Sequence, residues 1–169
     1  MKDITENKHI YMIAAIQKGR GIGYMGDLIH HIKLDMKHFM DTTKGHSIIM
    51  GRKNWESIPE KYRPLADREN IVISSNPDYD APGAIIVGSL EEALETASCS
   101  TIAIIGGQRV YSEGLAYADT LHLTLIDAKK TADTYFPEYE HLFNLKRKGI
   151  SNIDPKTGTS WCTSVWKKK

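Results

Sequence analysis

Short apolar runs and amphipathic segments alternate along the chain, and this alternation predicts its secondary structure. The runs are rich in isoleucine, valine and alanine, which is typical of strands buried on both faces of a parallel sheet. They occupy residues 10–16, 47–50, 70–73, 84–87 and 101–105. Residues 120–126 instead alternate leucines with His122, Thr124 and Ile126, which predicts a strand with one face toward water.

Helical spacing recurs between these runs. Residues 33–43, 52–58 and 108–116 predict helices, and Ser89 followed by Glu92 is a capping-box pattern that begins another. Near the end, residues 142–151 and 160–166 flank a turn and predict a hairpin. Strands and helices that alternate, followed by strands alone, predict an α/β fold with a mostly parallel sheet, helices on both faces and an antiparallel edge.

The helix predicted at residues 33–43 carries an acid on its apolar face. The apolar face comprises Ile32, Met36, Phe39, Met40 and Thr43, and Asp35 falls beside them. Burying a polar group without partners costs about 2–7 kcal/mol, so this carboxylate needs hydrogen-bond donors. Two explanations remain open: pairing with backbone amides at the helix N-terminus, or a place at the floor of a pocket that receives a ligand with donors.

Length and composition narrow the class of protein. The 169 residues fit one domain, with residues 1–8 expected to be a flexible N-terminal extension. The polar N-terminus resembles no secretory signal, and no apolar run is long enough for a membrane span. A net charge of +1 favours neither a nucleic-acid nor a membrane partner. Cys99 and Cys162 lack metal-ligand spacing, so we expect reduced thiols and no metal, which favours a cytoplasmic protein. We also expect the protein to be a monomer.

Glycines and cations follow two of the predicted strands, where an anion site would need them. Gly51-Arg52-Lys53-Asn54 and Gly106-Gly107-Gln108-Arg109 each begin a predicted helix, and Ser74-Ser75 ends a third strand. Helix N-termini at the carboxyl ends of strands bind phosphates, so these segments predict a ligand with several phosphates. Neither segment is a dinucleotide fingerprint or a Walker loop, and a solvated helix start remains the alternative for Arg52 and Lys53.

The combination of motifs is more specific than its parts. The segments IIMGRKNWESIP, RPLADREN, IVISS, IIGGQRVY, LTLIDA and DTYFPEYE occur in this order after Asp35. In this the chain resembles the dihydrofolate reductase family, from Ile10 to the terminal hairpin. The resemblance implies a single domain, residues 1–169, with a central eight-stranded, mostly parallel sheet, an antiparallel C-terminal hairpin and about four helices. It also implies that NADPH and dihydrofolate bind in a shared cleft.

Carried over by motif, the resemblance assigns roles on the substrate side. Asp35 would accept hydrogen bonds from the pterin and favour its protonation, Thr124 would support the acid, and Arg68 would bind the carboxylate of the glutamate tail. The remaining substrate positions are mostly apolar. They are Ile13, Ala14, Leu28, Met36, Phe39, Ile58, Leu65, Ile105 and Tyr111.

The resemblance also assigns a cofactor side. Ala15, Ile22 and Gly23 would line the nicotinamide and its ribose. Arg52, Ser74 and Ser75 would bind the 2′-phosphate, which favours NADPH over NADH. The positions around the pyrophosphate and the nicotinamide edge would be Gly51, Lys53, Asn54, Ile105, Gly106, Gly107, Gln108, Arg109, Val110 and Tyr111.

Departures from the family pattern keep alternatives open. Ile29-His30 stands where the family usually has Pro-Trp, and Lys33 replaces a proline at the helix start. We hypothesise that His30 acts in catalysis, by hydrogen bonding near the pterin carbonyl or by titrating near neutral pH; a solvent-facing histidine is the alternative. Rival functions are a reductase of the same fold that acts on a riboflavin-precursor pyrimidine, and a non-catalytic NADPH-binding module.

Overall fold

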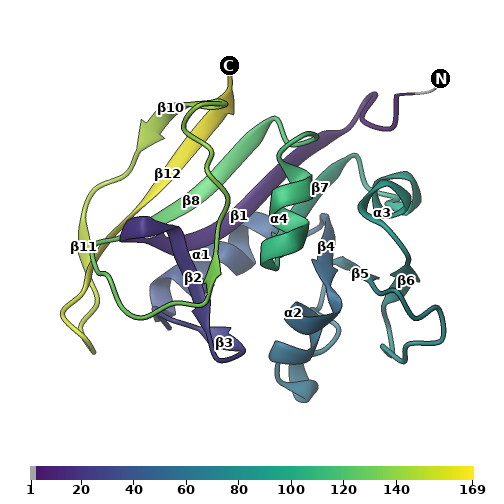
Figure 1. The fold of residues 1–169 in the computed structure, drawn as a ribbon, viewed down its shortest axis with the longest axis horizontal. Coiled ribbons are helices and arrows are strands. Elements are labelled where there is room, and N and C mark those ends of the chain that lie inside the picture. The colour runs from purple at the N-terminus through teal and green to yellow at the C-terminus, as the bar shows by residue number, and fades with distance from the viewer. Residues whose placement is uncertain (1–2) are drawn as a thin grey trace.

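A computed structural model describes residues 3–169, which fold around one central sheet (Figure 1). Its strands lie in the order β10 (Phe143–Lys148), β12 (Ser160–Lys168), β8 (Thr120–Ile126), β1 (His9–Gln17), β7 (Thr101–Gly106), β4 (Ser47–Gly51), β5 (Glu69–Ile73) and β6 (Ile85–Val87). The short β11 (Asn152–Ile153) also pairs with β12. Strands from β8 to β6 pair in parallel, whereas β12 is antiparallel to β8 and β10. The predicted α/β fold with an antiparallel C-terminal edge is confirmed.

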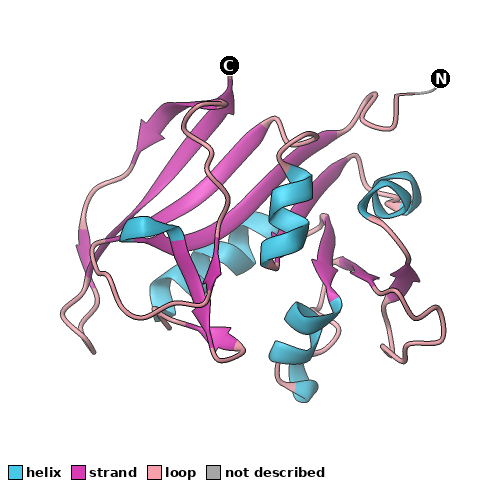
Figure 2. Cartoon of the chain, viewed as in Figure 1, coloured by secondary structure: helices cyan, strands magenta, loops and turns pink. Residues whose placement is uncertain are grey.

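Helices cover both faces of this sheet, as Figure 2 shows. The α-helices are α1 (Lys33–Thr43), α2 (Arg52–Ser57), α3 (Leu90–Thr96) and α4 (Gln108–Gly114), and short 3-10 turns occur at Lys18–Arg20 and Glu60–Tyr62. In Figure 1, α4 lies in front of the sheet and α1 behind it. Within residues 3–169, no helix has the length and apolar character needed to cross a membrane.

Alternation along the strands divides the core between the two faces. On β1, Ile10, Met12 and Ile16 join the cluster that α3 and α4 cover. Tyr11 and Ile13 point to the other face and join the cluster that contains side chains from α1 and α2. Because both faces are packed, these strands carry the continuous apolar runs that the sequence shows.

Strand β8 corrects one expectation. Leu121 and Leu123 face the α3/α4 cluster as the alternation requires. The opposite face was expected to meet water, but Thr120 and Thr124 are 1% and 4% exposed. The expectation is wrong because Thr124 has a half-buried hydrogen-bond partner on α1, described below, and so does not need water.

A second, three-stranded sheet was missed by the sequence analysis. It consists of β3 (Asp27–Leu28), β2 (Gly21–Tyr24) and β9 (Thr134–Tyr135). A Cβ on Gly23 would lie 2.4 Å from the Oγ1 atom of Thr134, so this pairing requires glycine. Glycine-rich strands this short carry no periodic apolar signal, which explains the omission.

The start of α3 departs slightly from the predicted capping box. At the start of α3, the Ser89 hydroxyl accepts from the Glu92 amide at 3.1 Å, as predicted. The Glu92 carboxylate accepts from the Gly88 amide, one residue before the amide that a capping box uses. At the N-terminus, Ile4 packs against the core and the Lys8 ammonium donates to the Leu94 carbonyl. Residues 1–2 of the predicted flexible extension lie outside the described residues, and its mobility stays a prediction.

Candidate functional site

The sheet parts at the carboxyl end of its central strand. Strand β1 pairs with β7 as far as Met12 and Ile104, whereas β1 pairs with β8 as far as Gln17. Where β1 and β7 diverge, the buried hydroxyl of Tyr111 lies 2.7 Å from the carbonyl oxygens of both Ile13 and Ile105 and shares its proton between them. Ligands of open α/β sheets bind at such points, so we place the candidate site here.

Asp35 lies in the first turn of α1, but it does not cap the helix. Its Oδ1 atom accepts a hydrogen bond of 2.5 Å from the Thr124 hydroxyl on β8. Burial raises the pKa of Asp35, while the Thr124 hydrogen bond and the charge of His38 act in the opposite direction. Of the two explanations for this acid, pairing with backbone amides is therefore wrong, and a place in a pocket agrees with the contact that is observed.

Apolar side chains gather beside this acid from several elements. Five of the predicted substrate-side positions belong to one cluster: Ile13, Phe39, Ile58, Leu65 and Ile105. Met36 and Leu28 are 50% and 48% exposed, so the expectation that Met36 faces the core is wrong. Ala14 packs into the cluster on the α3/α4 face instead.

Arg68 is held at the C-terminal end of α1. Its Nε atom donates to the Thr43 hydroxyl at 2.8 Å, and its terminal nitrogens donate to the carbonyls of Met40 and Ala66. These contacts place a guanidinium near the same helix that carries Asp35, about two turns further along.

The helix N-termini that follow β4 and β7 lie against each other. A Cβ on Gly51 would lie 3.8 Å from the Gly107 amide nitrogen and 3.4 Å from Val110, which is buried. A Cβ on Gly106 would lie 3.0 Å from the Asn54 side-chain oxygen, and the φ of Gly106 is 141°. The two glycine segments that the sequence selected are thus brought together, and at Gly106 a side chain would crowd Asn54.

The cations predicted to bind phosphates have local partners. The Arg52 guanidinium pairs with Glu56 at 2.5 Å and lies 5.9 Å from the ring of Tyr79, and Arg109 pairs with Glu113 at 3.2 Å. Both pairs are exposed and one helical turn apart, so each is weak enough to be exchanged for a ligand.

The neighbouring polar positions differ in exposure. Lys53 and Ser75 are exposed, whereas Ser74 is buried and its hydroxyl accepts from the Asn76 amide at 3.1 Å. On α4, the Gln108 side-chain oxygen (Oε1) accepts from the Tyr135 amide at 2.6 Å. Gln108 therefore ties α4 to β9, a link that the sequence analysis missed.

The predicted nicotinamide positions lie along β1 and β2. Ala15 packs with Ile32 and Trp161, and Ile22 packs against the α3/α4 cluster. Gly23 pairs with Leu28 in the small sheet. Their contacts with a cofactor stay a prediction.

His30 contacts a buried glutamine. Its Nε2 atom lies 3.0 Å from the side-chain oxygen of Gln17, which also accepts from the Lys130 amide, while the Gln17 amide donates to the Lys130 carbonyl at 2.7 Å. Burial and the nearby charges of Lys130 and His31 lower the pKa of His30, which argues against titration near neutral pH. A catalytic role for His30 stays a prediction. Gln17 was missed, although a polar residue at the end of an apolar run is the signal that could have found it.

A hollow of about 400 Å³ lies where β8 ends and β12 begins. Its lining includes Lys18, Asp127, Lys148, Trp161 and Cys162. None of the predicted site residues lines it, so we place the site by the converging side chains and not by this hollow.

Comparisons with known proteins agree on one family. A family model described as dihydrofolate reductase matches residues 9–168. Dihydrofolate reductase type 3 of Salmonella typhimurium is 41% identical over 77% of this chain and 79% of its own length. Dihydrofolate reductase of Bacillus subtilis is 41% identical over 78% of this chain and 77% of its own. That of Neisseria meningitidis serogroup A is 40% identical over 90% and 93%.

A solved structure is also similar. Dihydrofolate reductase from Enterococcus faecalis, complexed with NADP(H) and RAB-propyl, superposes with a TM-score of 0.85 and 28% identity, over 95% of this chain and 96% of that one.

Proposed function

The chain belongs to the dihydrofolate reductase family, and from this we propose that it reduces 7,8-dihydrofolate to 5,6,7,8-tetrahydrofolate with NADPH as the reductant. The observation that carries the proposal is the hydrogen bond between the half-buried Asp35 and the buried Thr124, beside the point where β1 and β7 diverge. It supplies an acid among apolar walls, next to the two glycine segments.

Asp35 would bind and orient the pterin. Thr124 engages one carboxylate oxygen, and the described hydrogen bonds leave Oδ2 available to accept from the amino group and ring N–H of a pterin. An anion at this place favours protonation of the pterin ring nitrogen, and burial strengthens the interaction because water screens it less. The apolar cluster of Ile13, Phe39 and Ile105 would hold the flat ring in one orientation.

The glycine segments suit a dinucleotide. Gly51, Gly106 and Gly107 present backbone at the two helix N-termini, in a space that a Cβ on Gly106 would partly fill. The exposed Arg52 and Ser75, with Ser74, would bind the 2′-phosphate once Arg52 leaves Glu56. When bound there, NADPH supplies the hydride, and the protein contributes orientation and electrostatics.

The rival functions are not favoured. The comparisons favour dihydrofolate reductase over the pyrimidine-reductase alternative, because the family model and every relative named above are described as dihydrofolate reductase. A non-catalytic module would not need a half-buried Asp35 with a hydrogen-bond partner of its own.

The test is NADPH oxidation, followed by its absorbance when dihydrofolate is added. We expect turnover in the parent and a loss of kcat/KM of about 10²–10⁴-fold in Asp35→Asn, the range attributed to proton-transfer groups. Asp41→Asn is the matched control, because Asp41 lies on the same helix but is exposed and pairs with Lys37. Equal activity in the parent and in Asp35→Asn would refute the assignment.

We further propose that the enzyme acts on this small molecule in the cytoplasm as a monomer. Support for the compartment comes from the free thiols of Cys99 and Cys162. The net charge of +1 favours neither a nucleic-acid nor a membrane partner. Light scattering should give a mass near 19.0 kDa, and a mass of twice that value would contradict the monomer.

A further inference from the structure

Gln17 is a buried glutamine at the carboxyl end of β1, and its side chain joins two segments that are far apart in the sequence. It is 4% exposed, and the three hydrogen bonds described above reach the backbone of Lys130 and the ring of His30. The chain closes over this side chain at Gly21, where a Cβ would lie 2.7 Å from the Gln17 Nε2 atom. His30 lies three residues before α1 begins, so the contact reaches the segment that leads to Asp35.

The backbone of Lys130 fixes which way the Gln17 amide points. The Lys130 N–H donates to Oε1 at 3.0 Å, and the Lys130 carbonyl accepts from Nε2 at 2.7 Å. A backbone N–H can only donate and a carbonyl can only accept, so a flipped amide would set donor against donor and acceptor against acceptor. The atom that faces His30 is therefore the amide oxygen, 3.0 Å from the imidazole Nε2 atom.

An oxygen in this position determines which nitrogen of His30 carries the proton. The Gln17 oxygen can only accept, so Nε2 of a neutral ring must be protonated and Nδ1 must hold the lone pair. The ring is neutral at physiological pH, because burial and the charges of Lys130 and His31 lower the pKa of His30. No hydrogen bond of its Nδ1 atom is described within residues 3–169, so this nitrogen is available to accept from a ligand.

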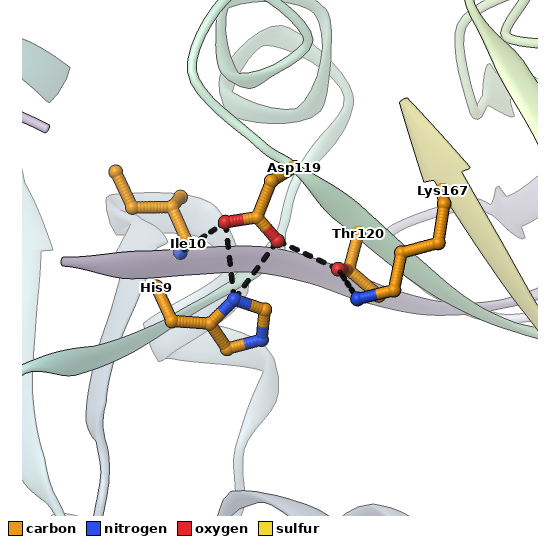
Figure 3. Close-up of polar contacts among 5 residues, drawn as sticks. All are labelled: His9, Ile10, Asp119, Thr120 and Lys167. Atoms are coloured by element: carbon orange, nitrogen blue, oxygen red, sulfur yellow. Dashed lines mark hydrogen bonds and ion pairs between the residues drawn. The ribbon is translucent and has the colours of Figure 1, made fainter. Parts of the chain in front are cut away.

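His9 shows the opposite arrangement. Its Nδ1 atom lies 2.8 Å and 3.0 Å from the two carboxylate oxygens of Asp119, which also accept from the Ile10 amide and the Thr120 hydroxyl (Figure 3). A carboxylate can only accept, so Nδ1 of His9 carries a proton. The partner of His9 is thus an anion that engages Nδ1, whereas the partner of His30 is a neutral amide that engages Nε2.

The charged groups near His30 come from two segments. Lys130 lies between β8 and β9, and His31, the neighbour of His30, lies 3.3 Å from Asp27 in an exposed pair. Within the described part of the chain, no acid contacts the His30 ring, and its hydrogen-bond partner is the amide of Gln17. The charge of the residue at position 17 should therefore decide the protonation of His30.

We propose that Gln17 is a positioning residue that holds His30 in the Nε2–H form, so that His30 offers a bound substrate an acceptor and not a donor. The proposal rests on the proposed function for its catalytic meaning, but the contact exists without substrate. It changes the hypothesis for His30, because a neutral ring in this form cannot donate to the pterin carbonyl, whereas Nδ1 can accept from an N–H or O–H group.

Nitrogen-15 NMR of histidine-labelled protein measures the tautomer, because the couplings from the ring C–H protons differ between protonated and unprotonated nitrogens. The spectrum is recorded above neutral pH, and the signals of His30 are identified by their loss in His30→Gln. We expect the proton on Nε2 of His30 and on Nδ1 of His9. A proton on Nδ1 of His30 would refute the inference.

Two substitutions of Gln17 separate electrostatics from packing. Gln17→Met keeps a similar length without an acceptor, and the titration midpoint of His30 should fall by about 0.5–1 pH unit, because an imidazolium loses more than a neutral ring. Gln17→Glu keeps an acceptor and adds a negative charge, so the midpoint should rise by about 1 pH unit. Shifts in one direction in both variants, or no shift in either, would overturn the inference. His141→Gln is the matched control, because His141 is exposed, and the midpoint of His30 should equal that of the parent.

The role of Gln17 in the reaction is tested by the pH profile of kcat/KM for dihydrofolate. In Gln17→Glu the profile should gain an ionisation at the raised midpoint of His30, and the double variant Gln17→Glu/His30→Gln should lose it. A profile of Gln17→Glu that does not follow the midpoint would contradict the positioning role. Opposite midpoint shifts in a protein that does not oxidise NADPH with dihydrofolate would leave the assigned tautomer standing and refute the proposed function instead.

Discussion

His122, which lies on β8 beneath α1, should lower the stability of the protein in mild acid. The pKa of His122 is lowered from 6.5 to about 4 in the folded protein. As the pH falls below 6.5, His122 therefore binds a proton in the unfolded chain but not in the folded protein. The free energy of unfolding decreases until the pH reaches about 4. The contribution has the opposite sign from that of a histidine paired with an acid.

The size of the effect follows from the two pKa values. A base with pKa 6.5 when unfolded and about 4 when folded loses ~2 kcal/mol of stability at pH 5 and almost nothing at pH 7.5. Because the ring is only partly buried, solvent screens part of this cost, and we halve the figure to ~1 kcal/mol. For a chain of this length, such a change moves the melting temperature by about 2–4 °C.

The assay compares thermal melting of the parent and His122→Phe at pH 7.5 and 5.0. Phenylalanine keeps an aromatic ring beside Tyr11, and no side-chain hydrogen bond of His122 is described within residues 3–169, so the substitution removes little besides the titration. We expect the parent to lose about 2–4 °C more than the variant between the two pH values. His141→Phe controls for loss of an exposed imidazole, and equal losses in the parent and His122→Phe would refute the reasoning.

Two further predictions concern backbone positions. Gly106→Ala should lower the free energy of unfolding by about 1–3 kcal/mol, because the φ of 141° at Gly106 is unfavourable for alanine and the new Cβ would meet Asn54 at 3.0 Å. Urea unfolding measures this change. Gly88→Ala is the control and should change the free energy of unfolding little, because its Cβ would make only an ordinary contact at 3.5 Å. Ser89→Ala should cost about 1 kcal/mol in the same assay, because it removes the N-cap of α3. A loss in Gly88→Ala as large as that in Gly106→Ala, or no loss in Ser89→Ala, would contradict these arguments.

Local patterns predicted the elements because periodicity is a local property. Helix α1 begins and ends where the spacing from Lys33 to Thr43 predicted, and β8 has its predicted bounds. The small sheet was missed because its pairing depends on close approach of Gly21 and Gly23 to a distant segment, and not on apolar spacing. Local patterns could not predict the partner of Gln17 either, because Lys130 lies 113 residues further along the chain.

The site depends on long-range register, which no local pattern specifies. Any helix over residues 33–43 places Asp35 and His38 on one face, but only the parallel pairing of β1 with β8, with Ala15 opposite Thr124, brings the threonine hydroxyl beneath Asp35. A slip of one residue would place a leucine there and leave the carboxylate buried without a donor. Leu121 and Leu123 prevent that slip, because they are buried in the α3/α4 cluster on the other face of the sheet. The apolar side of β8 therefore positions the polar side, and a substitution that weakens the leucine packing should disturb Asp35 before it unfolds the sheet.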